Sequence, residues 1–183
     1  KINNKKIMKK VFLIATIFSL IANVSFAQAS KVMAAYNYLS DYQANNVGDD
    51  LVSAKEAIDE AVKHEKTSIQ GKTWYYKGLV YYSLSKDSLL NKTDDNYLKE
   101  SFEAFDKSLN IDDKRFRNEK DAVNYIKAIS ADVFNTGVDA YQNRDSETAY
   151  HNFVMMKEVN EVLGANNGEV VVQTEKAVLN IAA

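Results

Sequence analysis

The chain has 183 residues, with 23 Lys and Arg against 25 Asp and Glu, six Gly, no Pro and no Cys. Average usage would give roughly nine prolines and about thirteen glycines in this length, so tight hairpin turns are scarce and a β-sandwich or propeller is disfavoured. Without cysteine the chain has no disulfide, thiolate nucleophile or cysteine-ligated zinc, and its two histidines, His64 and His151, are too few for a zinc centre.

Residues 1–27 have the layout of a secretory signal peptide. Five lysines and no acidic residue occur there, and the lysines precede an apolar run from Val11 to Ala22. A small-x-small pattern predicts cleavage after Ala27, with Ala29 as a second candidate, and Met8 is the natural start of such a leader. A transmembrane anchor is the alternative, but a span needs roughly 20 apolar residues. We therefore expect an exported protein, periplasmic or secreted, with no stable membrane span in the mature chain.

Removal of this leader makes the chain acidic. The loss of its five lysines leaves 18 basic against 25 acidic residues, a net charge of about −7. Nonspecific nucleic-acid binding depends on clustered Lys and Arg, so we expect no nucleic-acid partner. The cluster from Lys114 to Arg117 is flanked by acidic residues and is interpreted as a solvated turn between helices.

From Ser30 onward, apolar residues recur at steps of three and four, which predicts amphipathic helices throughout and an all-α fold. The runs, in chain order, are Leu51, Ala54, Ile58 and Ala61; Trp74, Gly78 and Tyr81; Leu98, Phe102, Phe105 and Leu109; Ala122, Ile126, Ile129, Val133, Gly137 and Ala140; Ala149, Phe153, Met156 and Leu163; and Val171, Thr174, Val178 and Ile181. Polar breaks separate them at 45–50, 64–72, 86–96, 112–118, 144–146 and 164–168. With an opening helix over 31–44, we expect seven helices joined as antiparallel hairpins.

Two glycines fall inside predicted helices, where each costs about 1 kcal/mol relative to Ala. We expect close approach of a neighbouring helix backbone to compensate. Their surroundings, Tyr75-x-x-Gly78-x-x-x-Tyr82 and Phe134-x-x-Gly137-x-x-x-Tyr141, are the same pattern 59 residues apart. The chain therefore contains an internal repeat.

These residues resemble the tetratricopeptide repeat, a helix hairpin of about 34 residues with a W-x-x-L-G-x-x-Y … A-x-x-x-F pattern. The matching residues are Trp74, Gly78, Tyr81, Ser101 and Phe105 in one unit and Gly137, Ala149 and Phe153 in another, with weaker units at residues 36–61 and from Val178 onward. The chain departs from the family pattern because no unit has its terminating proline, and Lys77 and Thr136 replace its leucine. The Trp74 unit is also about eleven residues longer than the family period.

The resemblance implies that residues 28–183 form a short α-solenoid of stacked hairpins, C-terminally incomplete. A generic helical bundle is the structural alternative. The final predicted helix has an apolar face that needs cover, and we expect it from a continuation of the array or from another chain. Alternatively, this helix packs back on Met156 and Val159. We also expect Trp74 to be buried in the core. Residues 86–96 are expected to form an exposed excursion, except that Leu89 and Leu90 tuck the loop onto the hairpin end.

Motifs for catalysis are absent from the sequence. No G-x-S-x-G, H-E-x-x-H, Gly-rich phosphate loop or G-x-G-x-x-G occurs. Acid pairs such as Asp49-Asp50 and Asp112-Asp113 flank predicted helices, where they suit caps and solvation rather than a calcium loop. His64 and His151 lie outside the apolar stripes and are predicted at the surface. We therefore expect no catalysis, no cofactor and no metal site.

The resemblance also implies a binding face, because the first helices of the family's hairpins line a concave groove that holds a partner peptide. The residues on that face here are Tyr75, Leu79, Tyr82, Phe134, Val138 and Tyr141. They are the predicted partner-binding set. The alternative is that they pack against the next hairpin, since aromatic stripes at helical spacing are often core.

The sequence thus predicts an exported, non-catalytic scaffold that binds a protein or peptide through the inner face of its hairpins. A carbohydrate-binding role in the cell envelope is the alternative, because exposed Tyr and Trp also stack on sugar rings. A hydrolase is disfavoured because no acid, base and nucleophile set is evident.

Overall fold

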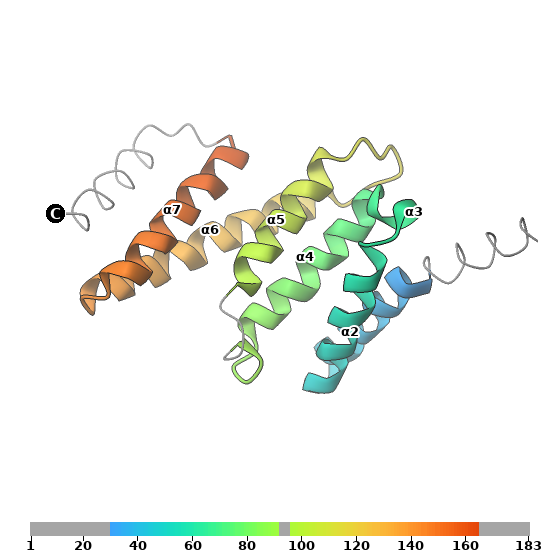
Figure 1. The fold of residues 1–183 in the computed structure, drawn as a ribbon, viewed down its shortest axis with the longest axis horizontal. Helices are drawn as coiled ribbons and strands as arrows, with labels where there is room; N and C mark the ends of the chain where they lie inside the picture. Colours follow the sequence, from blue (N-terminus) through green and yellow to red (C-terminus); the bar gives the residue numbers. More distant parts are fainter. Residues whose placement is uncertain (1–29, 92–95, 165–183) are drawn as a thin grey trace, which may run out of the picture. The chain divides into compact units, whose positions relative to one another are not determined.

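The computed structural model describes residues 30–91 and 96–164, which are helical with no strand (Figure 1). A helix over residues 30–45 is followed by α2 (Gly48–Ala61), α3 (Glu65–Ser68), α4 (Gly71–Lys86), α5 (Tyr97–Asn110), α6 (Glu119–Gln142) and α7 (Ser146–Val162). The all-α prediction is confirmed, and most helices end close to the predicted polar breaks, but the short α3 lies inside the break predicted at 64–72. The predicted leader and the predicted helix over 171–181 lie outside the described residues, as does the 92–95 part of the excursion.

The chain divides into two compact units, residues 1–69 and 70–183. In the described part of the first unit, Lys31 Nζ lies 2.7 Å from Glu60 Oε2, so the helix over 30–45 runs antiparallel to α2. The predicted run from Leu51 to Ala61 is buried between them. His64 is half-buried and caps α3, because its Nδ1 accepts a hydrogen bond from the Lys66 N–H at 3.3 Å. No helix within the described ranges combines the length and apolar character that a membrane crossing requires.

The described part of the second unit consists of two antiparallel hairpins, α4 with α5 and α6 with α7. In the first hairpin, Lys77 pairs with Glu100 at 2.7 Å, and Gly71 lies near the carbonyl oxygen of Ser108. Residue numbers therefore increase along α4 as they decrease along α5. In the second hairpin, Ser130 Oγ donates to Asn160 Oδ1 at 3.0 Å.

Each hairpin is held by an aromatic ring that lies on a helix glycine. A methyl group on Gly78 would lie 2.6 Å from Cδ1 and Cε1 of Phe105, and one on Gly137 would lie 3.0 Å from Cε1 of Phe153. In the first hairpin, Ser101 Oγ also donates to the Gly78 carbonyl at 2.9 Å. The predicted close approach is confirmed, but the neighbour is an aromatic ring and not a helix backbone. The internal repeat is therefore a repeated packing arrangement.

The second hairpin stacks on the first with α6 parallel to α4. The ring of Tyr75, near the start of α4, lies 6.0 Å from that of Phe116, and the ring of Tyr82 lies 5.3 Å from that of Tyr125. Phe105 on α5 stacks on the same Tyr125 at 5.1 Å with an interplanar angle of 10°. Tyr125 thus packs against both helices of the first hairpin.

In the turn between α6 and α7, Asp145 makes hydrogen bonds both to the end of α6 and to the start of α7. Arg144 has a left-handed φ of 62°, and the next N–H, of Asp145, donates back to the Ala140 carbonyl at 2.9 Å. The Asp145 carboxylate accepts from the Thr148 N–H at 3.1 Å and caps α7. These hydrogen bonds from Thr148 lower the pKa of Asp145.

The prediction that Trp74 is buried in the core is wrong. Its side chain is half-buried, with the ammonium of Lys107 3.7 Å from the centre of its ring. Tyr75 is the buried residue, with 7% of its surface exposed. Adjacent residues on a helix differ by about 100° in direction, so the three-and-four spacing left the choice between them open. In the described part of the excursion, the expectation that Leu89 and Leu90 tuck onto the hairpin end is wrong for Leu89, which is 75% exposed, whereas Leu90 is half-buried.

We predict that Gly78→Ala lowers the free energy of unfolding by about 1–2 kcal/mol, because overpacking against Phe105 exceeds the gain in helix propensity. Gly137→Ala is the matched control and should cost less, because its methyl group would meet Phe153 at 3.0 Å rather than 2.6 Å. Urea denaturation of both variants measures the difference. Equal losses, or a stabilised Gly78→Ala, would contradict the packing described here.

Candidate functional site

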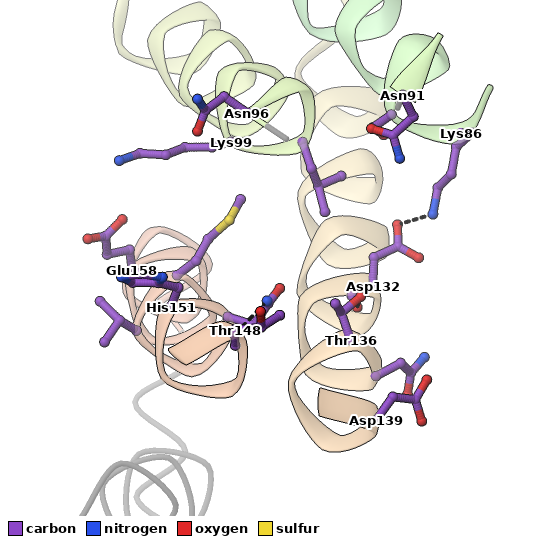
Figure 2. Close-up of a pocket in the computed structure, with 16 residues that line it drawn as sticks. Lys86, Asn91, Asn96, Lys99, Asp132, Thr136, Asp139, Thr148, His151 and Glu158 are labelled. Carbon is purple, nitrogen blue, oxygen red and sulfur yellow. Dashed lines mark hydrogen bonds and ion pairs between the residues drawn. The ribbon is translucent and has the colours of Figure 1, made fainter. Parts of the chain in front are cut away.

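A pocket of about 880 Å³ opens between the two hairpins of the second unit (Figure 2). We call it the inter-hairpin pocket. It lies where α5 and α7, which both pack on α6, contact each other at few points. The lining residues, from the end of α4 through α7, are Ser85, Lys86, Asn91, Asn96, Leu98, Lys99, Asp132, Asn135, Thr136, Asp139, Thr148, His151, Asn152, Val154, Met155 and Glu158.

The lining combines charges of both signs with amides and a few apolar side chains. Lys86 and Lys99 supply positive charge, and carboxylates come from α6 and α7. The four asparagine amides can each donate and accept hydrogen bonds, while Leu98 and Met155 supply apolar surface. Such a lining can pair with a ligand that presents alternating donors and acceptors beside short apolar groups.

One wall of the pocket is fixed by a cluster of three side chains. Tyr82 Oη donates to Asp132 Oδ2 at 3.2 Å, and Lys86 Nζ lies 2.6 Å from the same oxygen. The Lys86 ammonium also lies 5.2 Å from the centre of the Tyr82 ring. Burial, with the nearby Asp132 charge second, raises the pKa of Tyr82 to about 12. The cluster ties the end of α4 to the middle of α6.

The structure separates the six predicted partner-binding residues into two groups. Tyr75 is buried against Phe105 and Phe116, and Leu79 and Tyr82 are half-buried against the same core. This is the arrangement that the packing alternative describes.

The other three predicted residues lie on α6. Phe134 and Tyr141 are 43% and 52% exposed, and Val138 is half-buried. Phe134 is two residues from Asp132, and this step turns a helix by about 200°, so the three face away from the side of α6 that meets α4. None of the six lines the inter-hairpin pocket, and their contact with a partner stays a prediction.

Sequence reasoning missed the pocket because its lining is contributed by four helices that no motif connects. The available signal was a polar stripe on α6, where Asp132, Thr136 and Asp139 recur at steps of four and three. His151 is exposed as predicted and lies edge-on to Tyr150, with ring centres 5.8 Å apart. Among the residues that the structure describes, no three His, Asp or Glu side chains are grouped so that they could hold a metal ion.

Comparison with protein-family models, curated proteins and solved structures gives no match to this chain.

We predict that Tyr82→Phe lowers the free energy of unfolding at pH 7 by about 1 kcal/mol, the typical net value of one hydrogen bond. Burial and Asp132 favour the protonated phenol, so this tyrosine contributes stability that is complete below pH 10 and is lost as pH rises toward 12. Denaturation between pH 7 and 12 should therefore show a shallower alkaline loss for Tyr82→Phe than for the wild type. Tyr141→Phe, at an exposed position, should match the wild type, and a Tyr82→Phe profile that also matches it would contradict this assignment.

Proposed function

We propose that this chain is an exported, non-catalytic scaffold that binds a protein or peptide segment. Export rests on the sequence of residues 1–27. A tetratricopeptide-like stack is supported by the glycine–aromatic contact in both hairpins and by the parallel course of α4 and α6. These features also suit a binding surface made by successive hairpins, as in helical repeat proteins.

The observation that carries the proposal is the inter-hairpin pocket. Its volume, about 880 Å³, falls within the range of roughly 300–1,000 Å³ that is typical of ligand sites. A peptide presents N–H and C=O groups in alternation, and the asparagine amides of the lining can bond to either kind. The lining charges of both signs would select among side chains. Because the pocket is bordered by four helices, a bound segment would span both hairpins.

The predicted aromatic residues have distinct parts in this proposal. Tyr82 supports Asp132 at the pocket wall. The exposed residues of α6 lie on the other side of that helix, so they would contact only a partner that wraps around it. A carbohydrate partner remains the alternative, and it is favoured by the exposed rings of Tyr141 and Tyr150, which are 52% and 42% exposed.

Peptide and glycan arrays, probed with the purified chain, test the proposal. Thr136→Trp places an indole on the pocket side of α6, and we expect it to weaken peptide binding at least tenfold. Asn124→Trp puts the same side chain on an exposed site of α6 outside the lining, and it should bind like the wild type.

Two results would contradict the proposal. Binding to glycans alone would favour the carbohydrate alternative. Peptide binding that is equally strong in Thr136→Trp would place the site outside the inter-hairpin pocket. Circular dichroism of both variants establishes that they are folded before the arrays are compared.

A further inference from the structure

We propose that residues 165–183 dock as a helix on an exposed aromatic strip of α6 and α7 and so cover this face of the second hairpin from within the same chain. The strip consists of Phe134, Val138, Tyr141 and Tyr150, and we call it the terminal strip. The proposal does not depend on the proposed function, because the strip and the inter-hairpin pocket share no residue.

The internal repeat identifies the equivalent residues in the first hairpin. Gly78 contacts Phe105 as Gly137 contacts Phe153. Matching the two glycines aligns α4 with α6, and matching the two phenylalanines aligns α5 with α7. Each residue of the terminal strip then has a counterpart in α4 or α5. In the order Phe134, Val138, Tyr141 and Tyr150, the counterparts are Tyr75, Leu79, Tyr82 and Phe102.

In the first hairpin, the segment that follows α5 covers these positions. Phe116 in the turn before α6 packs on Tyr75, and Tyr125 on α6 packs on Tyr82. Tyr75 is thereby 7% exposed and Tyr82 is half-buried, and Phe102 on α5, which is 6% exposed, belongs to the same buried cluster. The segment that follows a hairpin in the sequence thus buries this face of that hairpin.

The same positions of the second hairpin are open in the part of the chain that the structure describes. Phe134, Tyr141 and Tyr150 are 43%, 52% and 42% exposed. Large apolar groups gathered on one face of a protein favour an interaction surface. The repeat also indicates the form of the missing cover, namely a helix parallel to α6.

Residues 165–183 have the sequence that such a cover requires. β-Branched side chains recur in this segment at steps of three and four, at Val171, Thr174, Val178 and Ile181. They would all lie on one face of a helix over the segment. Gly164, with a left-handed φ of 62°, ends α7, and Ala-Asn-Asn-Gly follows at 165–168 as a turn sequence. The segment follows α7 directly, as α6 follows α5, and a short connection favours docking within one chain over capture of another.

Engineered cysteines test this docking, because the chain has none of its own. We would pair Val138→Cys in the full-length chain with a cysteine at residue 171, 174, 178 or 181 in turn. Disulfides need Cα atoms within about 7 Å, so mild oxidation should give an intramolecular disulfide in at least one pair. Thr136→Cys, on the pocket side of α6, is the matched control and should give several-fold less. Equal disulfide yields from the Val138→Cys and Thr136→Cys series would overturn the proposal. Disulfides that form only between chains would also overturn it and would show that the segment docks on a second copy of the chain.

A second measurement does not depend on the register of the pairs. The thiol of Val138→Cys alone should react with an alkylating reagent at least tenfold faster when Val178→Glu and Ile181→Glu are added. The thiol of Thr136→Cys should react at the same rate with and without those two changes, which also establishes that the protein stays folded. An unchanged rate at Val138→Cys would show that the segment does not cover the strip and would favour a separate partner there.

Discussion

An aromatic ring lying on a glycine inside a helix is the contact on which the second unit depends. Glycine in a helix costs about 1 kcal/mol relative to alanine, and both hairpins accept this cost at equivalent positions. The missing side chain lets Phe105 lie directly against α4 and Phe153 against α6. Phe105 is fully buried and also stacks on Tyr125 of the following hairpin. One ring therefore sets the spacing within a hairpin and the position of the next.

The pocket follows from this arrangement. With Tyr125 packed against Phe105 and Tyr82, the first part of α6 lies against both helices of the first hairpin. α6 is 24 residues long and α5 is 14, and the later part of α6 supplies Asp132, Thr136 and Asp139 to the opening between α5 and α7. Tyr82 and Lys86 meet Asp132 at that point. Packing near the start of α6 thus positions a polar lining in the second half of the same helix.

Helical periodicity predicted the helices and their breaks because the apolar stripes of the described helices are regular. The two glycines pointed to a repeat, since each needs a compensating contact wherever it lies. The same periodicity could not show which of Trp74 and Tyr75 is buried, because the two residues are adjacent in the sequence and both lie close to the apolar face of the helix. Nor could it show that Tyr75 and Tyr82 pack against the next hairpin. Phe134 and Tyr141 occupy equivalent positions and are exposed, and this difference depends on which helices pack against each hairpin. The pocket residues are ordinary polar residues of four helices, and only their tertiary arrangement groups them.

A double-mutant cycle between Gly78 and Phe105 tests the central contact most directly. If the ring occupies the space that the glycine leaves, Phe105→Leu frees room for the methyl group of Gly78→Ala. The loss caused by Gly78→Ala should then largely disappear in the Phe105→Leu background, which gives a coupling energy of about 1 kcal/mol or more. If Gly78→Ala costs the same free energy in both backgrounds, the ring does not depend on the glycine and the account of the repeat is wrong.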